Sequence, residues 1–474
     1  MGLTFTERGS PRVSRPGRSR ATHAAVGATA LLIAVVMVPR LAPAADSLTL
    51  AQAYALAIGN FERVAVADTE VERTRLTPYR ALTTVAPSVA LGGTYTREKD
   101  EIVFGGTGAG PSQQLFGGEM VLALQESTKG FVRVEQPVLM PQVVPLWRAA
   151  RRAVEASEEA YAFAKQETAF AVAEAFYGVL RAQAASRVTE DTLKLAQDEQ
   201  RRAQLRYQVG ELVKADLLRV EVTVARAKQA VTTTANRVRL AREVLSRLIG
   251  TEVLRDLEEP PSPDLPADTA DTGVSIAEQN RPDLRRSERL LQVAIEESRR
   301  RIAALLPTVA AEWTYRRTGE ETFADRDDFW TFMLGLRVPL IDRGGGLWLD
   351  VKDQKYRVEQ ARLEYEALRR DIHLEVRERW LQVDTLQANL VTAREESDLA
   401  DETYRLVSQQ YDAGTATSLE ATTALTDRLR AQVALVDTSY GHDVAIIAVR
   451  RATGALVKDV ADDEPVRRME GEHR

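Results

Sequence analysis

The chain has 474 residues, a formal net charge of −6 and no cysteine. The lack of cysteine excludes disulfides, thiolate metal sites, cysteine nucleophiles and a lipid-modified N-terminal cysteine. Residues 1–44 are basic, and the rest of the chain carries 57 basic against 68 acidic side chains, a balance of −11. This acidic body argues against a nucleic-acid partner, which would require clustered Lys and Arg.

Residues 1–44 are predicted to be a signal peptide. A basic region formed by Arg12, Arg15, Arg18 and Arg20 precedes an uncharged, mostly apolar run over residues 24–38, and the small residues at 42–44 offer a cleavage point. The alternative is an uncleaved membrane anchor, but a run of 15 residues is shorter than the ~20 that a span requires. No later stretch is both long enough and apolar enough for a transmembrane helix, so entry into a membrane would require a closed β-barrel.

Residues 45–250 are predicted to form a first structural repeat, which opens with a helical pattern over 47–82. Apolar and small polar residues then alternate, which predicts a β-hairpin over about 88–136. Its second strand is expected to end before Pro137, because proline lacks the N–H that a sheet requires. The pattern does not define the strand boundaries within 97–131.

A long helical hairpin is expected over about 143–249, with its turn at Gly210. The glycine-rich stretch at 105–110 lies far from that turn, within the first β-hairpin. It has the composition of a phosphate-binding loop, but Pro111 and further polar residues follow it. A phosphate loop requires a helix at that point, so we expect a plain loop.

The same order of elements then begins again. Residues 251–274 are rich in proline and acidic residues, which predicts an extended linker. A second structural repeat is expected over 275–454, with a short helix from Ile276, a second helix, a β-hairpin over about 308–338 and a helical hairpin over about 347–452. A C-terminal tail, 455–474, follows.

The two halves match position by position, which indicates an internal duplication. Three residues of the first half recur 220 positions later, and a further set recurs 204 positions later. Shifts in the offset fall only in loops, which makes chance an unsatisfactory explanation. The first set is Asn60, Pro87 and Tyr95, and the second is Val172, Glu174, Tyr207, Gly210 and Gly250.

Each predicted β-hairpin has one face of Val, Leu, Tyr, Trp and Phe opposite a face of small, polar or charged residues. Strands of about ten residues with this alternation suit the wall of a transmembrane barrel. The alternative is an ordinary sheet packed on helices. Four strands are too few to close a barrel, so the membrane interpretation requires an oligomer.

Across about 45–455 the chain resembles the TolC family of outer-membrane efflux proteins. The resemblance depends on the duplicated order of elements and on two Tyr-x-x-Gly turns, each with an acidic residue six positions after the glycine. The strand ending at Val338-Pro339-Leu340, before a glycine-rich bend at 342–346, is also similar to the family's.

The resemblance implies a mostly α protein with transmembrane β structure. Three chains would form a 12-stranded β-barrel in the outer membrane, continued by a long α-barrel across the periplasm. The protein would catalyse no reaction and bind no cofactor or metal. It would be the exit duct of a tripartite efflux pump, a homotrimer in contact with outer-membrane lipid, a periplasmic adaptor and an inner-membrane pump.

The resemblance also implies a periplasmic gate formed by Tyr411, Glu420, Asp216 and Thr423. The arginine that the family places near the second turn is replaced here by Ala416, so its bond to Asp216 is lost. Lys214 is a candidate substitute. Glu420 and Asp216 have a simpler interpretation as acidic residues in the first turn of a helix, where they offset the helix dipole.

The tips of the two helical hairpins are the docking sites that the resemblance implies for the adaptor. Each tip contributes three residues: Val209, Gly210 and Glu211 in the first, and Ala413, Gly414 and Thr415 in the second. The glycines have an alternative role, since a residue with positive φ commonly ends a helix. Both roles are compatible.

Three other functions have to be considered. An enzyme is disfavoured because the four histidines are scattered and no nucleophile or cofactor motif is present. A periplasmic adaptor would carry one helical hairpin rather than two, and no paired β-hairpins. The outer-membrane duct of a type I protein secretion system would use the same tube, and the sequence does not separate it from an efflux duct.

Overall fold

The computed structural model describes the following residues: 47–100, 102–104, 120–318, 328–341 and 344–456. The chain divides into two compact units, 1–45 and 46–474, and the described residues belong to the second. The predicted signal peptide, the glycine-rich stretch at 105–110 and all but the first two residues of the predicted tail lie outside them.

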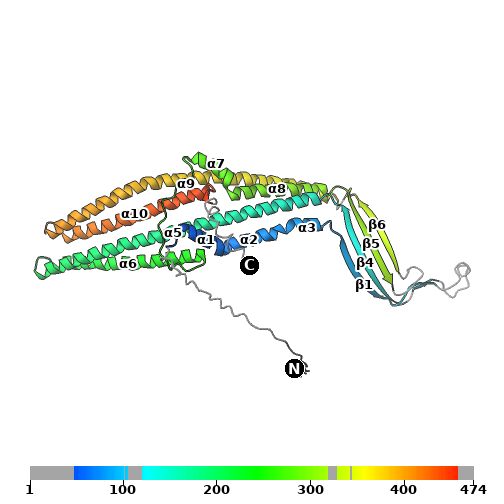
Figure 1. Ribbon diagram of the computed structural model, residues 1–474, viewed down its shortest axis with the longest axis horizontal. Helices are drawn as coiled ribbons and strands as arrows, with labels where there is room; N and C mark the ends of the chain where they lie inside the picture. The colour runs from blue at the N-terminus through cyan, green and yellow to red at the C-terminus, as the bar shows by residue number, and fades with distance from the viewer. Residues whose placement is uncertain (1–46, 101, 105–119, 319–327, 342–343, 457–474) are drawn as a thin grey trace, which may run out of the picture. The chain divides into compact units, whose positions relative to one another are not determined.

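The first half contains five described helices, which are α1 Leu50–Asn60, α2 Glu62–Arg75, α3 Thr77–Thr83, α5 Val143–Gln208 and α6 Lys214–Ile249. Helix α1 begins with a capping box, because the Thr49 hydroxyl accepts from Gln52 N and the Gln52 side chain accepts from Thr49 N. Helix α6 ends at Gly250, which adopts φ 73°. The elements of this half are shown in Figure 1.

The second half repeats this series with four described helices, α7 Ala270–Asn280, α8 Pro282–Ala303, α9 Gly346–Asp412 and α10 Ser418–Ala452. The prediction that the short helix starts at Ile276 is wrong: α7 starts six residues earlier, because the Thr269 hydroxyl caps it by accepting from Thr272 N. Residues 251–269 are largely extended, and Leu257 forms a parallel bridge with Leu48. Among the described helices, none combines the length and apolar character needed to cross a membrane.

Four antiparallel strands form one sheet in the order β1-β4-β5-β6. Their bounds are β1 Ser88–Arg97, β4 Glu126–Leu139, β5 Thr308–Thr318 and β6 Asp328–Arg337. A short ladder of β2 Ile102–Phe104 and β3 Met120–Ala123 extends the first β-hairpin. The second strand of the first β-hairpin, β4, therefore pairs with the first strand of the second β-hairpin, β5.

The prediction that the second strand ends before Pro137 is wrong, since β4 continues to Leu139. Pro137 pairs with Ala310, and the register between β4 and β5 shifts directly after it. A bulge of this kind accommodates a residue that cannot donate to the ladder. The Gln136 side chain donates to the carbonyl oxygens of Val85 and Pro137, both at 2.8 Å.

The register places most of the apolar residues of the four strands on the same face of the sheet. Leu91 pairs with Val132, Val132 with Tyr315, and Tyr315 with Trp330. The opposite face carries small and charged residues, including Arg133 and Glu312, whose Nε and Oε1 atoms lie 3.3 Å apart. The alternation predicted for each hairpin thus extends across the whole sheet.

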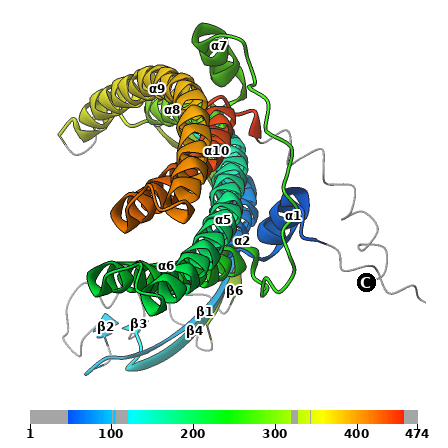
Figure 2. The same cartoon turned by 90° about the vertical axis from the view of Figure 1, so that its left-hand side faces the viewer.

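The order of the helices that flank the sheet follows the order of its strands. Helices α2 and α3 contact α5, α5 contacts α8, and α8 contacts α9. These helices lead into or out of β1, β4, β5 and β6 in turn. Helices α6 and α10 pack on α5 and α9 as the returning arms of two hairpins, and Figure 2 shows both hairpins from the side of their tips.

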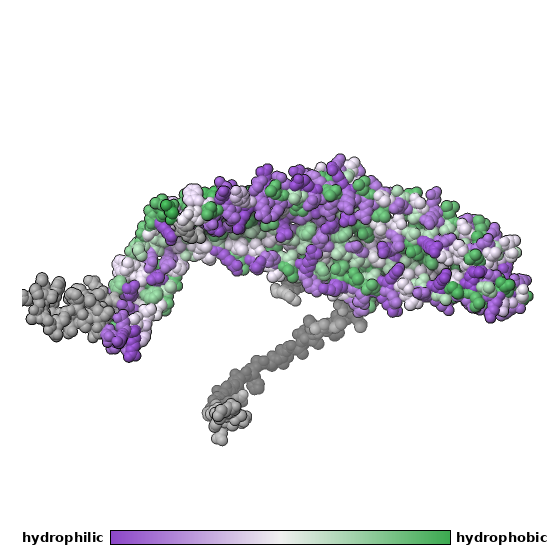
Figure 3. All heavy atoms as spheres, turned by 180° about the vertical axis from the view of Figure 1, so that it is seen from behind, coloured by the Kyte–Doolittle hydropathy of each residue, from purple (hydrophilic) through white to green (hydrophobic). Residues whose placement is uncertain are grey.

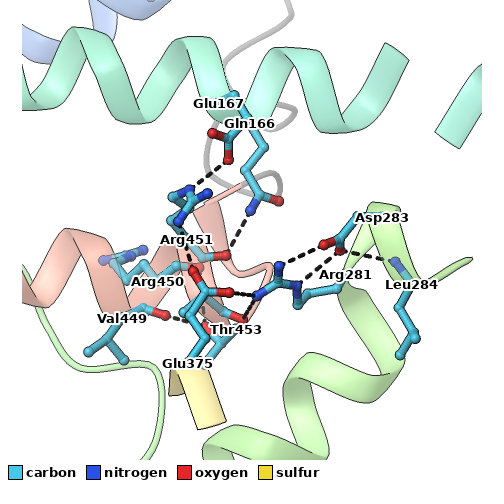
Figure 4. Close-up of polar contacts among 11 residues, drawn as sticks. Gln166, Glu167, Arg281, Asp283, Leu284, Glu375, Val449, Arg450, Arg451 and Thr453 are labelled. Carbon is cyan, nitrogen blue, oxygen red and sulfur yellow. Dashed lines mark hydrogen bonds and ion pairs between the residues drawn. The ribbon is translucent and has the colours of Figure 1, made fainter. Parts of the chain in front are cut away.

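A largely buried set of ion pairs, termed here the base network, joins helices α5, α8, α9 and α10 far from the tips (Figure 4). Arg281, whose side chain is 6% exposed, binds Asp283 at 2.6 Å and Glu375 on α9. Arg451 on α10 binds the same Glu375 at 2.9 Å and Glu167 on α5 at 2.6 Å. Since each buried charge has an opposite partner, the network fixes α9 and α10 against α5 and α8.

Candidate functional site at the helical tips

The two hairpin tips have the same backbone geometry. At the first tip Glu211 N donates to Arg206 O at 2.9 Å, and Gly210 N to Tyr207 O at 3.1 Å. The same two bonds, with the same lengths, recur at the second tip 204 residues later. Each is a Schellman motif, and each depends on a glycine with φ near 80°, at Gly210 and Gly414.

All six residues predicted to form the docking tips are exposed. Val209 at the first tip is 71% exposed, and Leu205, Val213 and Leu218 near it are also exposed apolar residues. The second tip has polar or small residues at most of the corresponding positions. The surface of the first tip is therefore the more apolar of the two, which suits contact with another protein.

The helices that follow the tips begin differently. Thr417 and Glu420 form a capping box on α10, with Thr417 N donating to Glu420 Oε2 at 2.7 Å. Hydrogen bonds from the Thr417 backbone and hydroxyl hold the pKa of Glu420 below its ordinary value. Helix α6 begins after Val213, which provides no side-chain cap. The interpretation of Glu420 as an acidic residue that stabilises a helix N-terminus thus has direct support.

The two tyrosines of the Tyr-x-x-Gly turns occupy opposite environments. Tyr207 is 41% exposed, whereas Tyr411 is 2% exposed. Arg206 on α5 lies over the Tyr411 ring at 5.1 Å, and its guanidinium donates to the carbonyl oxygens of Tyr411, at 2.6 Å, and Asp412. Arg206 therefore caps the C-terminus of α9 from the other hairpin, and its charge opposes the negative end of the helix dipole.

Asp216 lies at the contact between the two hairpins. Ser418 Oγ on α10 donates to Asp216 Oδ1 at 2.8 Å, and Arg219 on α6 donates both to Asp216 and to Ser418 Oγ. Lys214, the predicted substitute for the missing family arginine, makes no such contact within the described residues. The arginine that pairs with Asp216 comes instead from one turn further along the same helix.

The four predicted gate residues thus separate into two pairs. Tyr411 and Asp216 lie in the seam between the hairpins, where Asp216 is only partly exposed. Glu420 and Thr423 are three positions apart on α10 and are both exposed, so they share one free face of that helix.

Sequence reasoning missed Arg206, Arg219 and Ser418. The offset of 204 offered a signal for them, because their counterparts are Gln410, Thr423 and Lys214. At each of these positions one repeat has a charged residue and the other does not. The two hairpins make unequal contacts at the same positions.

The fold is that of the TolC-like outer-membrane channels, which confirms the predicted fold class. The chain matches the crystal structure of a membrane protein from Pseudomonas aeruginosa with a TM-score of 0.72 and 20% identity, covering 85% of this chain and 93% of that one. It matches the Campylobacter jejuni CmeC outer membrane channel with a TM-score of 0.72 and 16% identity, covering 88% and 89%.

The chain belongs to the outer membrane efflux protein family, whose profile matches residues 131–251 and 273–455. The resemblance drawn from the sequence is therefore confirmed. The outer membrane efflux protein BepC of Brucella suis biovar 1 (strain 1330) is 24% identical over 298 residues, which are 62% of this chain. The match spans 65% of the length of that relative.

Proposed function

We propose that the protein is the outer-membrane exit duct of a tripartite efflux pump and conducts substrates passively to the exterior. It would act as a homotrimer, with its long helices in the periplasm. One observation carries the proposal. The four strands form a sheet with a continuous apolar face, and the helices that continue these strands lie side by side in the same order as the strands. Such a unit is one segment of a wall.

The edges of the sheet support assembly. Strands β1 and β6 have no partner on their outer sides within the described residues. An unpaired edge favours pairing with another chain, so β6 of one copy is expected to join β1 of the next. In three copies the apolar faces would contact lipid, and the polar face with Arg133 and Glu312 would line the bore.

The junction of sheet and helices supports a membrane boundary at this level. Hydrophobic side chains gather there on the surface seen in Figure 3. The exposed apolar residues near the junction include Val138, Leu139, Leu340, Ile341, Trp348 and Leu349. Tryptophan is enriched at the interface between lipid and water, so the exposed Trp348 suits a position at that boundary.

The tips at the far end would dock a periplasmic adaptor and, through it, an inner-membrane pump. The exposed Val209 and Gly414 surfaces suit this role. Glu420 and Thr423, on the free face of α10, would line the periplasmic constriction in three copies, where like charges attract cations. Tyr411 and Asp216 would hold the hairpins together within each chain.

Crosslinking tests this assembly. The chain has no cysteine, so Thr94→Cys on β1 and Thr331→Cys on β6 would be its only thiols, both exposed on the polar face. A short bifunctional maleimide is expected to yield covalent trimers in outer-membrane fractions. Ala310→Cys with Gly335→Cys, which face each other within one chain, should yield monomers only. Monomers from the first pair would contradict the proposal.

A further inference from the structure

Glu199 on α5 is a buried carboxyl group that the gate described above does not use. Its side chain lies about three turns before the first tip and is 2% exposed. Neither of its carboxylate oxygens has a hydrogen-bond partner within the described residues. Ala196, one turn earlier, belongs to an apolar cluster that also contains Val224 of α6 and Leu425 of α10.

The charged and titratable groups around Glu199 come from three helices. Arg202 on α5 is committed to Asp412 on α9, with Nε and Oδ1 3.3 Å apart. Tyr404 and Tyr411 face Glu199 from α9. Arg428 on α10 stands over Tyr404 at 5.7 Å and binds Asp401 at 2.6 Å. Helix α6 contributes the apolar Val224 and Ala227 to this cluster.

The two arginines nearest to Glu199 are each paired with a carboxylate of α9, Arg202 with Asp412 and Arg428 with Asp401, and no hydrogen bond joins either of them to Glu199 among the described residues. A buried carboxylate without a partner is costly, whereas a protonated carboxyl group is much less so. Tyr411 Oη is also buried and without a partner in this part of the chain. The seam between the hairpins therefore tolerates Glu199 best when it carries a proton.

We propose that Glu199 is a proton-binding site that couples pH to the separation of the two hairpins near their tips. The protonated carboxyl group favours the packed seam, and the ionised group favours a seam that opens and admits water. The inference deepens the proposed function, because it rests on a gate at these tips. The counterpart in the second hairpin is Thr403, so the site exists once per chain.

The sign of the effect follows from burial. Burial raises the pKa of Glu199 from 4.5 to about 7, with Arg202 opposing the shift and Asp412 adding to it. An opened seam returns the group toward its ordinary value. Between these values the packed seam binds a proton that the open seam releases, so the packed seam is favoured at low pH. The equilibrium ratio of packed to open seam falls as pH rises toward 7, by a factor on the order of 100 in total.

Distance measurements on the full-length trimer test this site. The chain has no cysteine, so spin labels at Gln204→Cys on α5 and Gln409→Cys on α9, both exposed, would be unique. Labelled chains would be diluted with unlabelled chains, so that double electron–electron resonance reports the distance within one chain. The distance is expected to lengthen as pH rises from about 4.5 to about 7, and to change little above that pH.

Glu199→Gln, which is neutral and of the same size, is expected to keep the short distance at both pH values. Glu199→Leu should do the same. Glu190→Gln makes the same chemical change at an exposed position of α5, and it should respond like the parent chain. The proposal would be overturned if the distance between the labels in the parent chain did not change with pH. It would also be overturned if Glu199→Gln responded to pH as the parent chain does.

The measurement is independent of transport, because the distance is recorded within one chain. It reports on Glu199 whether or not the protein conducts substrates. Loss of export with an intact pH response would count against the proposed function and in favour of the proton-binding site.

Discussion

The two helical hairpins turn through the same backbone geometry and are held by different contacts. The first tip ends α5 with an exposed Tyr207 and begins α6 without a side-chain cap. The second buries Tyr411 under Arg206 and begins α10 with a capping box. Duplication has kept the bonds within each turn, and divergence has changed the contacts between the hairpins.

Asp216 and Glu420 show how far this divergence goes. Both are the third residue of their helices and are 204 positions apart. Glu420 turns back and accepts from Thr417 of its own helix. Asp216 has no hydroxyl at Val213 to bind, and it contacts Ser418 of the other hairpin instead. The two equivalent acidic residues thus have different roles: Glu420 caps the start of its own helix, and Asp216 contacts the other hairpin.

The largest difference is expected between the two tyrosines. Tyr411→Ala removes a buried ring and should lower the local opening free energy of the second tip by about 3 kcal/mol, whereas Tyr207→Ala should cost less than about 1 kcal/mol. Hydrogen exchange of the last turns of α9 and α5 measures both. Tyr411→Phe is the control, because the hydroxyl has no partner within the described residues and its loss should change little. Equal costs for both alanine variants would remove the proposed asymmetry.

An intermediate effect is expected at Arg206. Arg206→Ala removes two charge-assisted hydrogen bonds to the end of α9, and should lower the opening free energy of the second tip by about 2 kcal/mol. Gln410→Ala, at the corresponding exposed position of the second hairpin, should leave exchange nearly unchanged. A large effect at Gln410 with none at Arg206 would contradict the assignment of Arg206 as the cap of α9.

The smallest effect concerns the helix starts. Thr417→Ala should weaken the first turn of α10 by about 1 kcal/mol, and Val213→Thr should strengthen the first turn of α6 by a similar amount. Amide exchange in these turns is again the measurement. If the hydroxyl introduced by Val213→Thr brings no added protection to α6, the difference in capping does not explain the difference between the tips.

Much of the fold follows from local signals in the sequence. Alternation over 88–97 predicted β1, and the recurring offsets predicted two equivalent halves. Helix α5 starts at Val143, where its helical pattern begins. These features depend on neighbours in the chain, which a single sequence contains. The prediction at Pro137 is wrong because a bulge, set by the partner strand, accommodates the proline.

The site was less accessible to sequence reasoning. The two Tyr-x-x-Gly turns are alike in sequence, and only the contacts between the hairpins, such as that of Arg206 with the end of α9, decide that Tyr411 is the buried tyrosine. Arg206 and Glu199 lie among many charged residues of a long helix, and periodicity does not say which of them face another hairpin. Their roles depend on tertiary contacts, to which local propensity is blind.

The base network gives the second hairpin a mechanical property. Glu375 anchors α9 through Arg281 and Arg451, and Tyr411 lies 36 positions further along the same helix. At 1.5 Å per residue this is a lever arm of about 54 Å. A rotation of about 5° at this fulcrum would move the tip by about 5 Å. Small changes in packing at the base network are thereby amplified at the end of the helix.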